Sequence, residues 1–189
     1  MRADSRLPRV LDCAARTFRC NGYHGASMRE IARAVGMLPG SLYCHFASKE
    51  DLLVAVYEEG VRRLRTAVEL ALARETDPWR RLETACVAHL ETLLDGRDYA
   101  QVMLRVLPQD VSQAARRLRA VRDGYERVLA ELIDALPLDA AVGRSDVRLM
   151  LLGALNWVPT WYRRGKRSPA DVARVFVELL RTDLRGAPR

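Results

Sequence analysis

Apolar residues recur along this chain with the spacing of helices. The first segment shows it most clearly, because its apolar positions fall three or four residues apart and therefore share one helix face. These positions are Leu7, Val10, Leu11, Ala14, Ala15 and Phe18. The alternating apolar and polar positions that would predict strands are missing. We therefore predict an all-α fold.

Turn and capping residues divide the chain into helices. Asn21-Gly22 predicts the end of the first helix, because both residues adopt the left-handed conformation easily. Ser27 predicts the start of a second helix. Pro39 predicts the start of a short third helix, because proline is tolerated in a first turn. Ser48 predicts the start of a long fourth helix that runs to about residue 73. Further breakers leave predicted helices at 79–94, 98–107, 110–135, 145–164 and 170–184.

Positive charge is concentrated in the first quarter of the chain. Residues 1–49 hold eight Arg and Lys residues against three Asp and Glu residues, which accounts for +5 of the net charge of +7. Such an excess indicates an anionic partner, although charge alone does not separate nucleic acid from lipid or a phosphorylated ligand. The remaining residues are close to neutral. The sequence therefore predicts a basic first part and a balanced body.

Composition argues against several other classes of protein. No apolar stretch reaches the roughly 20 residues that span a bilayer, and no secretory signal opens the chain, so we expect a cytoplasmic protein with no membrane partner. The four cysteines form no CxxC pair and the three histidines lack ligand spacing, so we expect no metal and no cofactor. No Ser/His/Asp or paired-carboxylate pattern is present, and no catalytic residue is predicted.

Residues 27–46 have the spacing of a helix-turn-helix. A helix is followed by a tight turn at Gly36 and then by a short second helix. In this motif the second helix enters the major groove of DNA, and its first residues meet base edges. Ordinary helical hairpins share the spacing. The basic surroundings, with Tyr43, His45 and Lys49 near the end of the second helix, favour DNA binding.

The same stretch resembles the TetR family of bacterial repressors. Two motifs carry the resemblance: G-x-x-x-x-S-x-R-E-I-A-x-x-x-G from Gly22 to Gly36, and G-S-L-Y-x-H-F-x-S-K-E-x-L from Gly40 to Leu52. The resemblance implies a three-helix DNA-binding head, a helical ligand-binding body and a homodimer on a palindromic operator in double-stranded DNA. We accordingly expect a DNA-binding domain at residues 1–50 and a ligand-binding and dimerisation domain at residues 51–189.

The resemblance also implies which residues contact DNA. Tyr43, His45 and Lys49 match family positions that grip phosphates. The complete expected set is Ser27, Arg29, Leu38, Pro39, Gly40, Ser41, Tyr43, His45 and Lys49. Leu38-Pro39 stands where many relatives carry polar side chains that read bases, so the bases that are read stay open. An apolar Leu38 can still contact a thymine methyl group.

Two strongly apolar helices are predicted at the end of the body. Such stripes fit either a protomer core or a four-helix bundle across a twofold axis, and the resemblance implies the bundle. The residues expected at the dimer interface are Val158, Val172, Phe176, Leu179 and Leu180.

The run from Leu155 to Arg163 is similar to a TetR subgroup that responds to acyl-coenzyme A thioesters of fatty-acid or steroid breakdown. This resemblance implies an effector site at Trp157, Trp161 and Arg163. Both tryptophans can equally fill the dimer interface. The function expected is a ligand-responsive regulator, a repressor that such a thioester releases from its operator. The alternatives are an aromatic or cationic drug-like effector and, more remotely, a helical scaffold or an enzyme.

Overall fold

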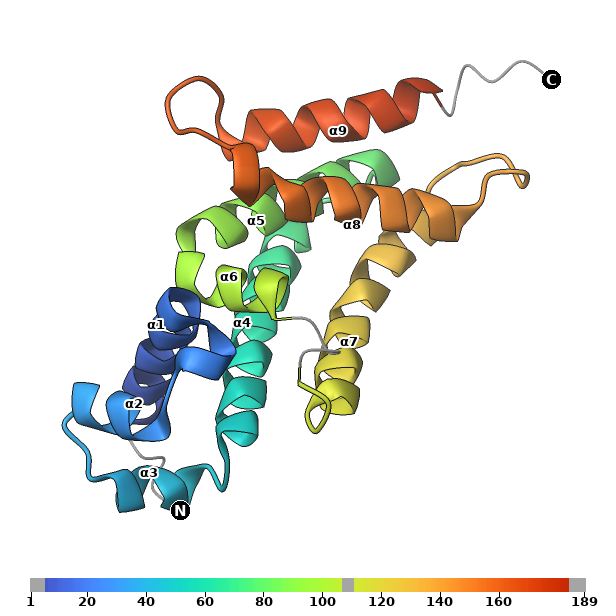
Figure 1. Ribbon diagram of the computed structural model, residues 1–189. Coiled ribbons are helices and arrows are strands. Elements are labelled where there is room, and N and C mark those ends of the chain that lie inside the picture. The colour runs from blue at the N-terminus through green and yellow to red at the C-terminus, as the bar shows by residue number, and fades with distance from the viewer. Residues whose placement is uncertain (1–5, 107–110, 184–189) are drawn as a thin grey trace. The chain divides into compact units, whose positions relative to one another are not determined.

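The computed structural model describes residues 6–106 and 111–183, and within these ranges it forms nine helices and no strand (Figure 1). The all-α prediction is confirmed. The helices are α1 (Leu7–Gly25), α2 (Met28–Ala34), α3 (Pro39–His45), α4 (Lys49–Leu72), α5 (Pro78–Asp95), α6 (Arg97–Arg105), α7 (Ala115–Asp134), α8 (Arg144–Trp161) and α9 (Pro169–Asp183).

Three helix ends show how local chemistry sets the boundaries. Gly22 has φ +69°, so it interrupts α1 at the predicted place, and one further helical turn reaches Gly25. The helix predicted from residue 110 begins only at Ala115, because residues 111–114 form turns; residues 107–110 lie outside the described ranges. Helix α8 ends at Trp161 instead of 164, with Pro159 in its last turn, where proline removes one backbone donor.

The chain divides into two compact units. The first unit comprises residues 1–62 and 96–122. Within it, α1 packs against α2 and α6, and α2 packs against α3. Their apolar faces form a continuous core with the start of α4. Its members include Val10, Ala14, Phe18, Ile31, Leu42, Leu52, Leu53, Val56, Val102 and Leu118.

The second unit comprises residues 63–95 and 123–189. Helix α5 packs against both α8 and α9, and α8 also packs against α9. Helices α4 and α7 each begin in the first unit and end in the second. Within the described ranges, no helix combines the length and apolar character needed to cross a bilayer.

Candidate nucleic-acid interface

The helix-turn-helix begins at a well-formed cap. Ser27 lies outside α2 in an extended conformation, and its hydroxyl oxygen accepts a hydrogen bond from the Glu30 amide at 3.2 Å. The Glu30 carboxylate accepts a second bond, of 2.9 Å, from the Asn21 side chain at the end of α1. Gly36, with φ +69°, makes the turn between α2 and α3, a conformation that a residue with a side chain rarely adopts. The chain thus enters α3 along a defined path.

Helix α3 exposes almost its whole surface. Leu42 is its single buried residue, and it joins the core of the first unit. Leu38 is 75% exposed just before the helix, and Tyr43 is 48% exposed within it. Large apolar side chains that no described part of the chain covers are available to a partner.

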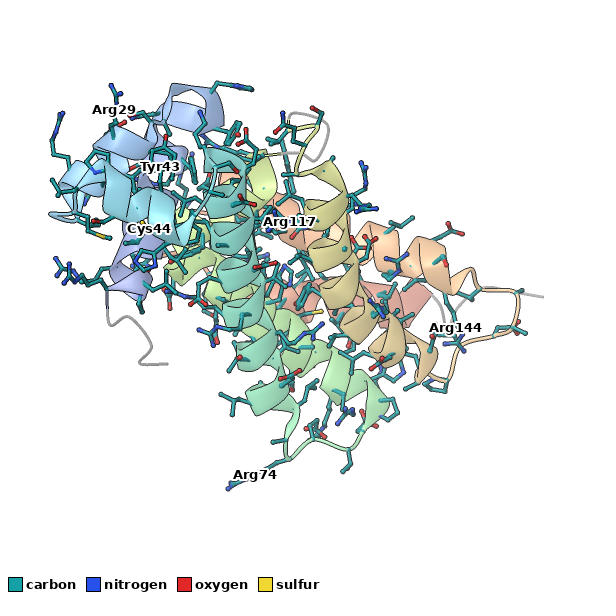
Figure 2. All side chains as sticks on the ribbon, turned by 90° about the horizontal axis from the view of Figure 1, so that it is seen from below. Arg29, Tyr43, Cys44, Arg74, Arg117 and Arg144 are labelled. Carbon is teal, nitrogen blue, oxygen red and sulfur yellow. The ribbon has the colours of Figure 1, made fainter. Side chains whose placement is uncertain are left out.

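The structure brings most of the predicted DNA contacts together on α2 and α3. Figure 2 labels Arg29, Tyr43 and Cys44 in this part of the chain. Pro39 is half-buried, and the other predicted residues here are exposed: Ser27, Arg29, Leu38, Gly40, Ser41, Tyr43 and His45. This distribution leaves a surface free to approach DNA on both helices.

Lys49 is placed differently from the other predicted contacts. It is half-buried at the start of α4, and its Nζ donates to the backbone oxygens of Tyr23 at 2.9 Å, His24 at 3.4 Å and Ala26 at 3.0 Å. Its ammonium also lies 4.5 Å from the centroid of the Tyr23 ring. All three hydrogens of the ammonium therefore have acceptors inside the protomer, a role that the sequence did not predict.

The residues predicted for the dimer interface separate into two groups. Val158, Val172 and Leu180 are 0%, 2% and 5% exposed, because they pack inside their own protomer. Within the protomer these three side chains leave almost no surface for a partner to cover. Phe176 is half-buried and Leu179 is 60% exposed.

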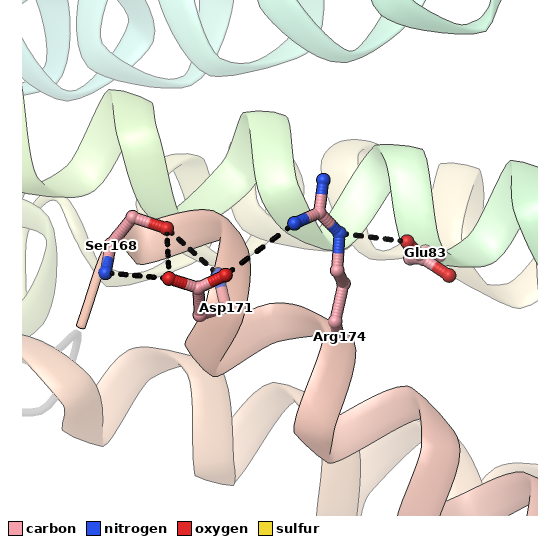
Figure 3. Close-up of polar contacts among 4 residues, drawn as sticks. All are labelled: Glu83, Ser168, Asp171 and Arg174. Carbon is pink, nitrogen blue, oxygen red and sulfur yellow. Dashed lines mark hydrogen bonds and ion pairs between the residues drawn. The ribbon is translucent and has the colours of Figure 1, made fainter.

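The start of α9 is held in place by a Ser168–Asp171 cap, and Arg174 bridges Asp171 and Glu83 of α5 (Figure 3).

Helices α8 and α9 both carry large exposed apolar residues. On α8 the positions recur so that they share one helix face. The set, which we call the α8–α9 face, contains Leu149, Met150, Trp157 and Trp161 on α8, and Val175 and Leu179 on α9. Trp157 is 65% exposed and Trp161 45%. Both tryptophans predicted for the effector site are thus on the surface of the protomer.

A cavity of about 630 Å³ lies between the end of α5 and the loop that joins α8 to α9. Trp157, Trp161 and Arg163 are not among its lining residues. Arg163 is exposed and donates to the Tyr162 carbonyl at 3.2 Å. The lining mixes acids with cations and includes Asp95, Arg164, Lys166, Arg167 and Asp171. The three predicted effector residues therefore lie outside the lining of this cavity.

Sequence reasoning missed a polar cluster inside the second unit. His89 of α5 is 1% exposed. Its Nδ1 lies 2.8 Å from the Tyr125 hydroxyl of α7, and its Nε2 lies 3.3 Å from Oδ1 of Asn156 of α8. Since an amide oxygen only accepts, Nε2 donates to Asn156, and Nδ1 accepts from Tyr125. Burial lowers the pKa of His89 to about 4, so the ring is neutral near pH 7.

The partners of His89 could not be read from the sequence, because Tyr125 and Asn156 lie 36 and 67 residues away from it. Such a cluster is unusual, since burial of polar groups costs free energy unless each group finds a partner. We call His89, Tyr125 and Asn156 the buried polar triad.

Two family profiles match the chain. A profile described as bacterial regulatory proteins, tetR family, covers residues 10–56. A second, described as tetracyclin repressor-like, C-terminal domain, covers residues 75–184, which is more than half of the chain. Head and body therefore both match the same family.

Individual proteins agree with the profiles. The transcriptional activator FasR of Mycolicibacterium smegmatis is 30% identical over 151 residues, which cover 79% of this chain and 67% of FasR. The fatty acid metabolism regulator protein of Bacillus subtilis is 23% identical over 157 residues, which cover 80% of this chain and 81% of that protein. The structure of AibR, solved with isovaleryl coenzyme A and operator DNA, superposes with a TM-score of 0.78 at 23% identity, covering 93% of this chain and 97% of AibR. At that identity the AibR likeness shows a shared fold. The chain belongs to the TetR family of bacterial regulatory proteins, and it is a ligand-responsive DNA-binding transcriptional regulator and not an enzyme.

Proposed function

We propose that this regulator binds a palindromic operator as a homodimer and acts as a repressor that an acyl-coenzyme A thioester releases from DNA. The observation that carries the DNA part is the surface of α3, where Leu42 alone is buried. A short helix that keeps one anchor in the core and exposes its other side chains fits the recognition helix of a helix-turn-helix.

The proposed contacts divide between bases and backbone. The first residues of a recognition helix reach base edges, while phosphate contacts set the position of the protein. The residues proposed for base edges are Leu38, Pro39, Gly40 and Ser41. The residues proposed for phosphates are Ser27, Arg29, Tyr43 and His45. Residues 1–50 form the DNA-binding domain in this proposal, residues 51–189 bind the ligand and dimerise, and the protein acts in the cytoplasm, where bacterial DNA lies.

The α8–α9 face is proposed as the dimer interface. Contiguous apolar residues on a protein surface mark interaction sites, and a twofold interface brings the same patch of two subunits together. Leu179, Trp157 and Trp161 are the exposed members that a second protomer would cover. This assigns both tryptophans to dimerisation, in place of the effector site that the subgroup resemblance implied.

The buried polar triad is proposed as the polar part of the effector site. Ligand sites are mostly apolar, with few polar groups that fix orientation. Residues from α5, α7 and α8 meet in the triad, within a core of aliphatic side chains. A thioester carbonyl would accept the hydrogen bond that Tyr125 now donates to His89. The basic loop 163–167 supplies cations for the phosphates of coenzyme A. The relatives support this class of effector, because one regulates fatty acid metabolism and AibR was solved with isovaleryl coenzyme A.

The function is tested by release from DNA. The operator is first selected from a random DNA pool with the purified protein. The complex is then titrated with acyl-coenzyme A thioesters of increasing chain length, and the controls are the matching free acids and coenzyme A alone. Release by a thioester, but not by its free acid, supports the proposal. Release only by planar aromatic or cationic compounds would replace the proposed class of effector. Tighter DNA binding in the presence of a thioester would contradict release from the operator.

A further inference from the structure

A capped helix start bounds the helix-turn-helix on each side. It begins at Ser27, the cap of α2, and ends at Ser48, whose hydroxyl oxygen accepts a bond from the Asp51 amide at 3.0 Å in the first turn of α4. Between these points α2 and α3 contain seven residues each. Helices this short are not stable alone, so contacts from outside must hold them in position.

Lys49 joins these two points. It is the first residue of α4, directly after Ser48, and its Nζ reaches the carbonyls of Tyr23, His24 and Ala26, directly before Ser27. These carbonyls stand at the end of α1, where the last carbonyls of a helix lack partners and carry partial negative charge. A lysine ammonium satisfies both needs, since it carries a full positive charge and three donors.

The next residue strengthens the same junction. The Tyr23 hydroxyl donates to Oε1 of Glu50 at 2.5 Å. Tyr23 is 8% exposed, and the Lys49 ammonium lies over its ring. The bond from Tyr23 holds the pKa of Glu50 below its ordinary value, so this carboxylate stays charged beside Lys49. Two consecutive residues of α4 thus contact Tyr23 at the end of α1. Lys49 binds its backbone carbonyl, and Glu50 binds its side-chain hydroxyl.

We infer that Lys49 is a positioning residue, and that Lys49, Tyr23 and Glu50 form a corner clamp that fixes where the helix-turn-helix starts relative to where it ends. Lys49 then supports DNA binding through the backbone of the α1–α2 corner and makes no phosphate contact of its own. The inference rests on the proposed DNA-contact surface. It changes the role that the family resemblance implied for this residue.

The first test uses the free protein, so it is independent of DNA. Lys49→Met removes the ammonium and keeps most of the chain length. Amide hydrogen exchange is measured at Ala26 and Ile31, whose amides donate to Gly22 and Ser27. Loss of the clamp should speed exchange about tenfold at both amides. Arg29→Met, which removes an exposed cation of α2, should leave exchange unchanged. Unchanged exchange in Lys49→Met overturns the inference.

The second test measures operator affinity at several salt concentrations. A phosphate contact lowers the slope of log affinity against log salt by about 0.9 when it is removed. Arg29→Met should show this drop. Lys49→Met should weaken operator binding about tenfold with an unchanged slope. A Lys49→Met slope that falls like that of Arg29→Met would identify Lys49 as a phosphate ligand.

Two milder variants keep the inference testable if Lys49→Met does not fold. Lys49→Arg preserves the charge and would preserve a phosphate contact, but a planar guanidinium cannot aim at three converging carbonyls. We expect it to show fast exchange and weak binding, and full rescue by arginine contradicts the clamp. Tyr23→Phe removes one buried hydroxyl and no charge, and it should also speed exchange at Ala26. If the wild type and all variants show the expected exchange rates and yet none of them binds DNA, the proposed function fails and the clamp stands.

Discussion

The Tyr125 hydroxyl donates a 2.8 Å hydrogen bond to Nδ1 of His89 inside the second unit of the chain. Both side chains are buried, at 5% and 1% exposure, and their rings lie 5.7 Å apart between centroids. The contact ties α5 to α7, and Asn156 extends it to α8. A neutral histidine is required, because Nδ1 must accept while Nε2 donates.

The stability of the protein should depend on pH through His89. The pKa of His89 is about 4 in the folded protein, against 6.5 ordinarily. Between these two pH values, His89 therefore binds a proton in the unfolded chain but not in the folded protein. The contribution of the neutral His89 to the free energy of unfolding is present above pH 6.5 and is lost as pH falls toward 4. The free energy of unfolding should fall by about 2 kcal/mol between pH 7 and pH 5 through this group. Urea unfolding at several pH values measures it. The His89→Gln variant has no titrating group at this position, so its stability should not show this fall with pH. Equal pH dependence in the variant and the wild type would contradict the prediction.

Removal of the Tyr125 hydroxyl should destabilise the body. Tyr125→Phe leaves Nδ1 of His89 buried without a donor, at a cost of about 2 kcal/mol. The matched control is Tyr162→Phe, because the Tyr162 hydroxyl donates to the Arg167 carbonyl in an exposed loop, where water can replace it. We expect the control to cost less than about 1 kcal/mol. Chemical denaturation at pH 7.5 compares the two, and similar losses would argue against a special role for the triad.

Two neighbouring leucines of α9 should respond oppositely to arginine. Leu179 is exposed on the α8–α9 face, so Leu179→Arg should give folded monomers that have lost operator affinity. Leu180 is buried in its own protomer, so Leu180→Arg should unfold or precipitate the protein, with a loss of about 3 kcal/mol or more. Sedimentation and circular dichroism distinguish the results. A dimeric Leu179→Arg protein would move the interface elsewhere.

Tyr43 and Leu38 should affect DNA binding in different ways. Tyr43→Phe removes a neutral phosphate donor, so operator and random DNA should both bind about fivefold more weakly. Leu38→Ala removes an apolar contact to a base, so operator affinity should fall while random DNA is bound as before. Fluorescence anisotropy with both DNAs measures the ratio. A uniform loss in Leu38→Ala would place this residue on the backbone.

Much of the fold followed from local pattern. The 3.6-residue spacing predicted the helices, and Ser27, Gly36 and Ser48 marked helix ends near those observed. These helix ends can be predicted from sequence because capping and left-handed turns depend on one residue and its close neighbours. The motifs from Gly22 to Leu52 indicated the family for the same reason, since they form one short contiguous stretch.

The sequence by itself determined an all-helical regulator with a helix-turn-helix, and only the tertiary structure decided what its apolar and charged residues touch. Leu179 and Leu180 are adjacent and identical, yet one is exposed and the other buried, because packing of α9 on α5 selects the covered face. Lys49 matches a family position that grips phosphates, and only the structure shows that its Nζ contacts carbonyls at the end of α1. Periodicity reports which residues share a face. It does not report which neighbour covers that face, because that depends on contacts between residues far apart in the chain.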